Sequence, residues 1–531
     1  MNTRSLKSQA LITLGIVLGI LILLNIVSVR IFGRIDATKN NLFTLSPASK
    51  DLVRGLDDKV TVKVYFTEDL PAPYNSNRRE VLDELNEYKA YSRGNLQYEF
   101  IDPSGPKGES DAQQEGIAPV QVQVMNQDKF EVKRAYMGLV FLYEDKKEVL
   151  PLIQSTATLE YDISSTLKRL TSKGMKKIGF LTGSGEPPLS ELSHSQELLK
   201  KQYQISEVNI SHGAPVPPDI AALVVMAPAS KIFEPEKFRI DQYVMRGGKV
   251  AFLLNRVDAN LQARMGRALD LGLDDMLDAY GLKINADLVR DIQCANISIM
   301  QQQMGFSFQS QVPYPFLPAA SNFSKGNTMV KDLQGIIFYF ISSIDTVNNA
   351  ARDLKGEILI RTSKQSGRST GPFFIDPMQR YTREEIGQSF GESGIPLAAI
   401  VQGQFKSLYA GKPAPADTAA GSTPPPANPL TSSPETRVVL VGDGDFVRDQ
   451  FVGNRDNLTF FANMIDYLVD DAGLITIRTK EVATPPLEQV SDGTKKFVKY
   501  GNLILPPLLV VGYGFFRWRL RKTRRRMLEA S

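Results

Sequence analysis

The sequence contains very little cysteine and histidine. Of its 531 residues, 1 is a cysteine and 2 are histidines. A single cysteine, Cys294, excludes any disulfide bond within the chain, so the fold must be held by its hydrophobic core. No base can be identified near Cys294, and we interpret it as a buried structural thiol, not a nucleophile. His194 and His212 are too few for a histidine-rich metal site and leave few options for base catalysis.

Sequence signatures of ATPases, serine hydrolases and nucleic-acid-binding proteins are also missing. The chain has no Gly-x-x-x-x-Gly-Lys-Ser/Thr loop and no Gly-x-Ser-x-Gly elbow, so any ATP would be hydrolysed by a partner. The net charge is only +4, and seven cationic side chains lie between Arg517 and Arg526. The rest of the chain is therefore near neutral, which excludes the electrostatic footprint of a nucleic-acid-binding protein. We expect a non-enzymatic protein with no cofactor.

Two long apolar segments, one near each end, contain uncharged runs, residues 10–29 and residues 501–516; with Tyr500 and Trp518 counted as interface residues, the second reaches from 500 to 518. Residues 10–29 would form a helix of about 30 Å, and residues 500–518 one of roughly 28 Å. No small-x-small cleavage site follows the first segment before Arg30 and no cysteine lies directly behind it, so we interpret it as an uncleaved anchor. Pro506 and Pro507 are tolerated in a membrane span. The sequence therefore predicts two transmembrane helices; a buried C-terminal helix is the alternative for the second.

The basic residues at the C-terminus predict the orientation of these spans. Residues 519–531 are rich in arginine, and such a tail resists translocation and remains in the cytoplasm. Two spans then place both termini in the cytoplasm and residues 31–498 outside it.

The first domain, residues 36–155, is predicted to be a small α/β layer. Lys59–Phe66 and Leu96–Ile101 have strand patterns, and Arg78–Ser92 between them has the apolar spacing of an amphipathic helix. We expect a β-α-β unit with a parallel strand pair. A hairpin with a four-residue loop, Glu144–Lys147, follows. Leu159–Leu170 is predicted to be a helix that bridges to the next domain.

The second domain, residues 175–480, alternates strands and helices as a doubly wound, mostly parallel sheet does. The predicted strands are Lys177–Thr182, Ser206–Ile210, Ala222–Met226, Val250–Leu254, Arg437–Gly442 and Leu474–Arg478. The predicted helices are Ser190–Gln202, Pro235–Arg246, Leu269–Tyr280 and Leu458–Val469.

Two parts of this domain interrupt the alternation. Between residues 284 and 400 the pattern predicts strands at Ile336–Ile341 and Glu357–Ile360, and prolines suggest a loop over residues 301–318. The order of these strands in a sheet does not follow from the sequence. Residues 411–435 are rich in proline, alanine and serine, which predicts a disordered insertion within one domain.

Two loops at the carboxyl ends of predicted strands are candidate ligand sites. Gly183, Gly185 and Glu186 follow one strand, where backbone N–H groups could hold a phosphate. Glu186 would repel an anion, so a tight turn is the alternative. Asp443 and Asp445 follow another strand and could bind Mg²⁺ or Ca²⁺ or act in hydrolysis. Capping and turn stabilisation is the alternative that requires no metal.

Several motifs, in this order and between two anchors, resemble the gliding-motility GldG type of ABC-transporter auxiliary protein. The residues that carry the resemblance are Asp36, Thr38, Leu42, Leu45, Ser46, Glu160–Ser165, Gly183, Gly185, Glu186, Val441–Phe446, Asn457, Phe461 and Asn463. The resemblance covers nearly the whole chain. The sequence departs from the family at Ser184, where the family often has histidine. This departure weakens any chemical role for the loop of residues 183–186.

The resemblance implies a bacterial inner-membrane protein that works beside an ABC permease and an ATPase, alone or as a homo- or hetero-oligomer. It also implies that the large domain is related to one in intraflagellar transport proteins. Gliding itself does not follow, because the family also occurs in non-gliding bacteria. We expect an extracytoplasmic subunit that binds a substrate or an envelope partner. The alternatives are an envelope scaffold without a transporter and a membrane-anchored hydrolase that uses Asp443, Asp445 and Glu186.

Overall fold

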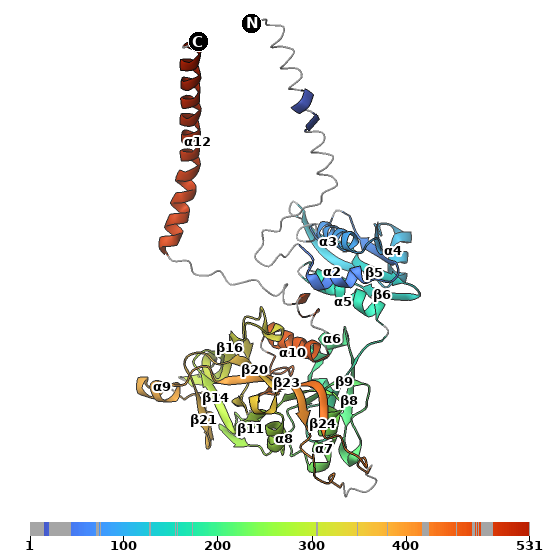
Figure 1. Ribbon diagram of the computed structural model, residues 1–531, viewed down its shortest axis with the longest axis vertical. Coiled ribbons are helices and arrows are strands. Elements are labelled where there is room, and N and C mark those ends of the chain that lie inside the picture. The colour runs from blue at the N-terminus through green and yellow to red at the C-terminus, as the bar shows by residue number, and fades with distance from the viewer. Residues whose placement is uncertain are drawn as a thin grey trace. The chain divides into compact units, whose positions relative to one another are not determined.

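The structure is a computed structural model of the chain (Figure 1). It describes residues 15–17, 19, 20, most of 44–478, and 492–529. The gaps within 44–478 are 69, 71–73, 75, 127–128, 154–155, 157, 173, 304–305, 348, 380, 417–423, 453, 470–472, 474 and 476. Two compact units, residues 1–483 and 484–531, make up the chain, and each is described by itself.

The N-terminal domain is a four-stranded sheet covered by helices. Its strands are β1 (Val60–Phe66), β2 (Leu96–Ile101), β5 (Met137–Tyr143) and β6 (Lys146–Leu150), in the order β2-β1-β5-β6. The helices are α2 (Pro47–Arg54), α3 (Asn77–Tyr91), α4 (Pro106–Gln114) and α5 (Leu159–Thr171). A separate hairpin contains β3 (Val120–Asn126) and β4 (Lys129–Ala135). Because β1 and β2 pair in parallel across α3, the predicted β-α-β unit is confirmed.

Helix α5 belongs to the core of this domain. Leu159, Ile163, Leu167 and Leu170 are buried with β1 and β5 side chains such as Val62 and Phe141. The i, i+4, i+8, i+11 spacing places these residues on the same face of the helix. The predicted helix therefore does more than bridge two domains. The predicted four-residue hairpin loop is wrong: Tyr143 pairs with Lys146, so Glu144 and Asp145 alone form the turn, with a positive φ of 51° at Glu144.

The large domain is built on an eight-stranded mixed sheet in the order β17-β20-β23-β24-β10-β9-β7-β8. These strands are β7 (Lys177–Thr182), β8 (Gln204–Asn209), β9 (Ile220–Met226), β10 (Lys249–Leu253), β17 (Asn322–Phe323), β20 (Lys355–Arg361), β23 (Pro396–Lys406) and β24 (Ser432–Val441). The run β24-β10-β9-β7-β8 is parallel, and the remaining pairs are antiparallel. The prediction of a mostly parallel sheet therefore holds for the five strands from β24 to β8 and not for β17, β20 and β23.

Helices cover both faces of this sheet, as expected for a doubly wound fold. Along β9, Val224 packs in the core beneath α6 (Ser193–Lys200) and α10 (Arg455–Leu468). Its neighbours Leu223 and Val225 face the opposite core, beneath α7 (Glu234–Met245) and α8 (Asp274–Ala279). This alternation explains why β9 is apolar on both sides. The two helix pairs lie on opposite sides of the sheet in Figure 1.

Smaller β elements surround the sheet. They are β11 (Val257–Asn260), β12 (Met265–Ala268), β13 (Leu282–Ile284), β14 (Asp287–Asp291), β15 (Cys294–Gln303), β16 (Phe306–Ala320), β18 (Ile336–Ile337), β19 (Ile344–Thr346), β21 (Ser366–Thr370) and β22 (Phe373–Phe374). A short helix, α9 (Arg383–Ser389), has a capping box at Thr382 and Glu385.

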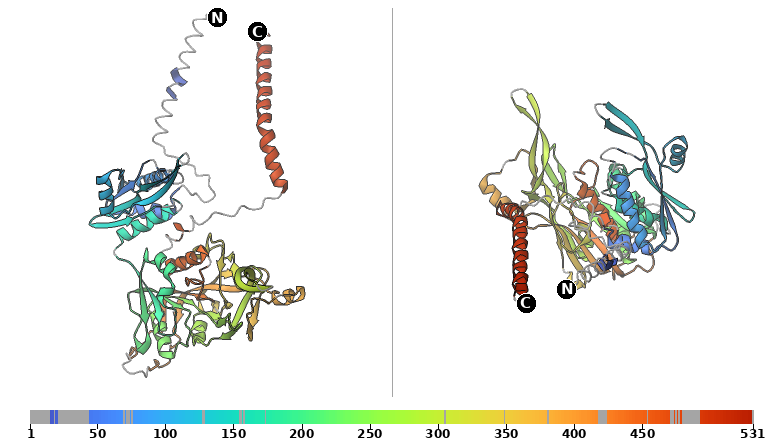
Figure 2. Two further views of the ribbon diagram at one scale, coloured as in Figure 1. Left: turned by 180° about the vertical axis from the view of Figure 1, so that it is seen from behind. Right: turned by 90° about the horizontal axis from the view of Figure 1, so that it is seen from above.

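The loop predicted over residues 301–318 is wrong. Strands β15 and β16 form a long antiparallel hairpin there, which Figure 2 shows in yellow-green projecting from the domain. Pro313 and Pro318 are tolerated because the strand pairing is irregular between their partners, Asn296 and Cys294. The strand predicted at Leu474–Arg478 is also wrong, because the described residues of that segment are helical.

The proline-rich insertion joins two neighbouring antiparallel strands, β23 and β24. It therefore interrupts one domain, as predicted. Its predicted range, 411–435, is too long at the end, since Ser432–Glu435 belong to β24. Residues 417–423 lie outside the described residues.

The C-terminal unit is a single helix, α12 (Asp492–Glu529), which contains the second predicted span. Within the described part of the chain, no helix is both long enough and apolar enough to cross a membrane. Most of the first predicted span, 10–29, lies outside the described residues. Both spans therefore remain predictions.

Candidate ligand-binding cleft

The parallel strands of the large domain define where a ligand would bind. Their spatial order reverses between β7 and β9, because β8 lies on one side of β7 and β9 on the other. In open α/β sheets a crevice forms at such a reversal, beyond the carboxyl ends of the strands. The loops after β7, β9, β10 and β24 meet there around a cleft of about 680 Å³.

The loop after β7 turns sharply and is tied to the loop after β9. Gly185 has a φ of +81°, and a Cβ there would lie 3.1 Å from the Cβ of Ala229. The carbonyl oxygen of Ser184 accepts hydrogen bonds from the N–H groups of Ala229 (3.1 Å) and Ser230 (2.9 Å). Glycine is favoured at position 185, because a side chain there would strain the left-handed backbone and would require Ala229 to shift by a few tenths of an ångström.

Glu186 closes this turn with one carboxylate oxygen. Its Oε2 accepts a hydrogen bond of 2.7 Å from the N–H of Ser184. Its Oε1 is buried, and no described residue donates a hydrogen bond to it. Burial raises the pKa of the Glu186 carboxyl, although hydrogen bonds from backbone N–H groups act in the opposite direction.

The turn after β24 depends on Asp443, which is fully buried. Its Oδ1 accepts from the N–H of Asp445 and its Oδ2 from the N–H of Tyr339, both at 2.7 Å. Burial and the adjacent Asp445 raise the pKa of the Asp443 carboxyl well above its ordinary value. Asp443 thus shapes the turn and holds Tyr339 at the cleft.

Asp445 faces the cleft and belongs to a polar network. Its Oδ1 accepts from Nη1 of Arg448 at 2.6 Å, and its Oδ2 accepts from Nδ2 of Asn255 at 2.7 Å. Asn255 follows β10 and also accepts a 2.7 Å bond from the N–H of Gly444. Arg448 donates from Nε to Glu191 at 3.1 Å. This network joins the loops after β10 and β24 to the short 3-10 turn that precedes α6.

Aromatic side chains and strained backbone form another part of the cleft. Tyr339, Phe340 and Phe451 line it, and the rings of Tyr339 and Phe451 lie 4.9 Å apart. Phe340 has a φ of +54° and Ala227 a φ of +41°, both in the left-handed region. Such conformations are costly for residues other than glycine and often occur at functional sites.

The structure brings together three of the five residues singled out from the sequence. Gly185, Glu186 and Asp445 line the cleft, whereas Gly183 and Asp443 do not. Among the described residues, no group of three or more His, Cys, Asp or Glu side chains could hold a metal ion.

Sequence reasoning missed the remaining polar residues of the cleft. Asn255 immediately follows a predicted strand, and the rule that selected Asp445 would have found it. Arg448 lies three residues after Asp445, a spacing typical of local ion pairs. Tyr339 and Phe340 gave no local signal, because they belong to the region whose strands could not be ordered.

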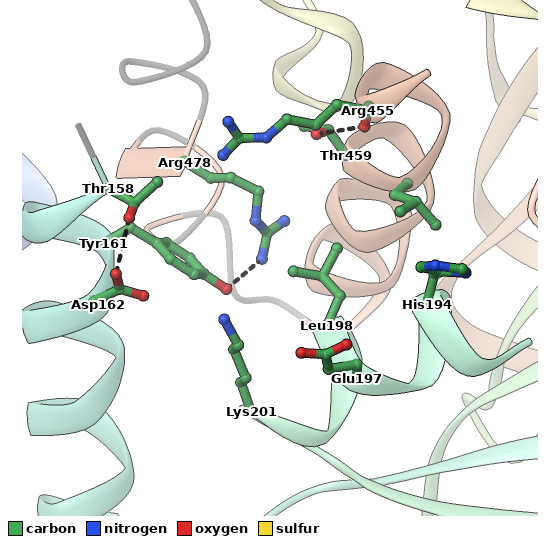
Figure 3. A pocket seen from close by; sticks show the side chains of 11 residues that line it. Thr158, Tyr161, Asp162, His194, Glu197, Leu198, Lys201, Arg455, Thr459 and Arg478 are labelled. Atoms are coloured by element: carbon green, nitrogen blue, oxygen red, sulfur yellow. Dashed lines mark hydrogen bonds between the residues drawn. The ribbon is translucent and has the colours of Figure 1, made fainter. Parts of the chain in front are cut away.

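A second pocket, of about 280 Å³, lies between α5, α6 and α10 (Figure 3). Arg478 points into it and donates from Nη2 to the Tyr161 hydroxyl at 2.8 Å, while its Nη1 lies 2.8 Å from Oδ2 of Asp466. The other charged side chains in its lining are Asp162, His194, Glu197, Lys201 and Arg455. Arg478 is already paired with Asp466, and the remaining cations, Lys201 and Arg455, are matched in number by Asp162 and Glu197, so this pocket does not favour a ligand of either charge. We interpret it as a structural junction.

Three comparisons with known proteins bear on this architecture. A family model described as "ABC-type uncharacterized transport system" matches residues 175–471, more than half of the chain. A model of a domain of unknown function matches residues 39–142. An uncharacterized protein of Borreliella burgdorferi is 23% identical over 522 residues, which are 96% of this chain and 97% of the relative.

A solved structure, the mmIFT52 N-terminal domain, is similar to 55% of this chain at 12% sequence identity. The similarity covers 97% of that domain with a TM-score of 0.32, which is too low to support an argument about fold or function.

Proposed function

Because this chain belongs to the ABC-type uncharacterized transport system family, as an auxiliary component, we propose that it is a non-catalytic subunit of an ABC transport complex. The large domain binds a substrate or an envelope partner, and a separate permease and ATPase complete the complex. The observation that carries this proposal is the family match, which spans the whole parallel sheet and the cleft at its carboxyl edge. Transport in a gliding-motility-type system is one form that this role could take.

The proposal includes anchoring in the bacterial inner membrane by residues 10–29 and 500–518. Apolar segments of this length, uncharged over residues 10–29 and 501–516 and the second followed by a basic tail, support that arrangement. Both termini then lie in the cytoplasm, and the two α/β domains lie outside it. The anchors dock on the permease, and the cleft faces the compartment in which the substrate is met.

The cleft geometry favours binding over hydrolysis. Both oxygens of Asp443 accept backbone N–H groups, and both oxygens of Asp445 are bonded to Asn255 and Arg448. Neither carboxylate is therefore placed to activate a water molecule or a substrate hydroxyl. A volume of about 680 Å³ is typical of small-molecule sites.

Affinity purification from the native membrane tests this function. With the tagged chain at its natural expression level in a mild detergent, we expect a permease and an ATPase to co-purify. Deletion of residues 500–531 should release both partners if the anchor docks on the permease. Isolation of the intact chain without either partner would contradict the proposal.

A further inference from the structure

The projecting hairpin β15–β16 lacks the features that normally protect the edge of a sheet. Residues 292–324, which include both strands, contain no charged side chain, although 23% of the chain is charged. Strand β15 also contains no proline and no glycine. Proteins usually place charges, prolines or bulges on exposed edge strands, because a free row of N–H and C=O groups pairs readily with another strand.

The edges of the two larger sheets follow this rule. In the four-stranded sheet, the edge strand β2 contains Glu99 and the edge strand β6 contains Lys146 and Lys147. In the eight-stranded sheet, the edge strand β8 contains Glu207, and β17 at the other edge is only two residues long. The uncharged β15 therefore departs from the pattern of these edges.

The unprotected edge of the hairpin is the outer edge of β15. The strand order is β15-β16-β18, and in the described part of the chain no strand pairs with β15 on the side away from β16. In an antiparallel pair, every second residue directs its N–H and C=O groups away from the partner strand. Strand β16 is protected differently, since Ala319 and Ala320 pair with β18 and prolines stand at 313, 315 and 318.

The side chains of β15 leave this edge accessible. Asn296, Ser298 and Met300 are exposed, and the exposed fraction of Met300 is 71%. The alternation of a strand places them on one face, while Ile297 on the other face packs against the domain. The hairpin projects from the domain (Figure 2), so a second strand can approach β15 without meeting a charged side chain of the hairpin.

A second copy of the chain is the partner that this edge fits. A strand that pairs with β15 must itself have a free edge and no repelling charge, and β15 of another copy has both. Two identical strands can pair antiparallel around a two-fold axis, with reciprocal contacts. Such a pair is closed, because it uses the unprotected edge of both copies and leaves the proline-containing strands outside.

We propose that two copies of the chain associate through the outer edges of β15, so that their two β15–β16 hairpins form one continuous four-stranded antiparallel sheet. The contact uses residues 294–303 of each copy. This inference goes beyond the proposed function and does not depend on it.

Analytical ultracentrifugation of the purified full-length chain, in a density-matched detergent, tests the proposal. Because an edge-to-edge contact is small, we expect a dimer with a dissociation constant of about 1–50 μM. The variant Ser298→Lys/Met300→Lys places two lysines of each copy at the contact, where like charges on paired strands repel. It should weaken the dimer by at least about 10-fold.

The matched control is Gln309→Lys/Gln311→Lys, which adds the same charge at exposed positions of β16. Both double variants remove the side-chain hydrogen bond between Gln311 and Ser298. In the proposed dimer the lysines on the two copies of β16 would be about 14 Å apart, beyond the Debye length of about 8 Å at physiological ionic strength, so the dimer should persist. Circular dichroism should show that both variants keep the fold of the parent.

Dissociation of the dimer by both double variants, or by neither, would contradict the proposed contact. A parent chain that remains monomeric at about 200 μM would overturn the proposal. If the parent is monomeric and only Ser298→Lys/Met300→Lys no longer co-purifies with the permease, the edge binds that partner and not a second copy.

Cross-linking supplies a second measurement that does not depend on affinity. In a Cys294→Ser background, the substitutions Asn296→Cys, Ser298→Cys and Met300→Cys are made singly and treated with a short bismaleimide. At least one of them should give a covalent dimer, whereas Gln309→Cys should not. Absence of a covalent dimer at all three positions of β15 would overturn the proposal.

Discussion

At the scale of single residues, Glu186 carries a local cost to the stability of the fold. A side chain selected for folding alone would not bury a carboxylate oxygen without a donor. The cleft also contains two non-glycine residues with positive φ, Ala227 and Phe340. Such local costs are expected where a protein keeps groups ready for a ligand.

This cost gives a pH-dependent prediction for stability. Burial raises the pKa of Glu186 above its ordinary 4.5, so the folded state resists ionisation of this group. The protonated Glu186 carboxyl contributes fully to the stability of the folded state below about pH 4. This contribution is lost as the pH rises through the raised pKa of the folded state. Glu186→Gln cannot ionise and should have a higher Tm than the parent at pH 8. We expect a gain of only about 1–3 °C, because the side chain is partly exposed to solvent.

Thermal unfolding followed by circular dichroism at pH 8 and pH 4 measures this effect. The gain should disappear at pH 4, and Glu207→Gln should show no comparable gain at pH 8, because that side chain is exposed. A Glu186→Gln variant that is less stable than the parent at pH 8 would show that the carboxylate is satisfied in the folded state.

Part of the site could be predicted at this scale. Glu186 and Asp445 were found because the carboxyl ends of parallel strands meet at one edge of the sheet. Tyr339 reaches the same edge through the hydrogen bond from its N–H to Asp443, across a separation of 104 residues. No local pattern encodes such a contact, so sequence reasoning could not find it.

At the scale of elements, α5 is the segment where both ends of the folded region meet. Oε1 of Glu160 accepts from the N–H of Ser46 at 2.6 Å and from the hydroxyl of Ser49 at 2.7 Å. The next residue, Tyr161, packs with Ile477 and Ala48 and accepts a hydrogen bond from Arg478. The segments that lead to the two predicted spans are therefore held by adjacent residues of one helix.

Replacement of Arg478 tests the importance of this junction. The side chains of Arg478 and Asp466 are only 7% and 0% exposed, so Arg478→Met would leave a buried carboxylate without its cation. We expect a loss of about 3–5 kcal/mol in the free energy of unfolding. Urea denaturation of the purified chain, followed by circular dichroism, measures it.

The double variant Arg478→Met/Asp466→Asn should recover part of this loss, because it removes the buried charge and retains an acceptor for the Tyr203 hydroxyl. A loss below about 1 kcal/mol for Arg478→Met would mean that the ion pair does not hold the junction.

The predictability of the elements follows the range of their contacts. The unit β1-α3-β2 and the alternation from β7 to β10 were predicted correctly, because local hydrophobic periodicity encodes them. The hairpin β15–β16 was missed although its pairing is local, because its prolines suggested a loop. The antiparallel strands β20 and β23 take their place in the sheet only through non-local pairing.

At the scale of the whole molecule, the account combines an auxiliary transport family, a ligand-sized cleft and two predicted anchors. The family match covers the residues that form the parallel sheet and its cleft. The proposed anchors are supported by the two uncharged runs, residues 10–29 and 501–516, and by the basic tail. The proposed function requires that the cleft lies outside the cytoplasm, separated from the ATP that the proposed ATPase partner hydrolyses.

Thiol labelling in cells tests this requirement most directly. In a Cys294→Ser background, a cysteine is placed at the exposed Ser110 of α4, at the exposed Glu207 of β8, or at Ser531 in the predicted cytoplasmic tail. A maleimide that cannot cross the inner membrane is added to cells with a permeabilised outer membrane. The account predicts labelling at positions 110 and 207 before lysis, and at position 531 only after it. Labelling at 110 and 207 only after lysis would contradict the account.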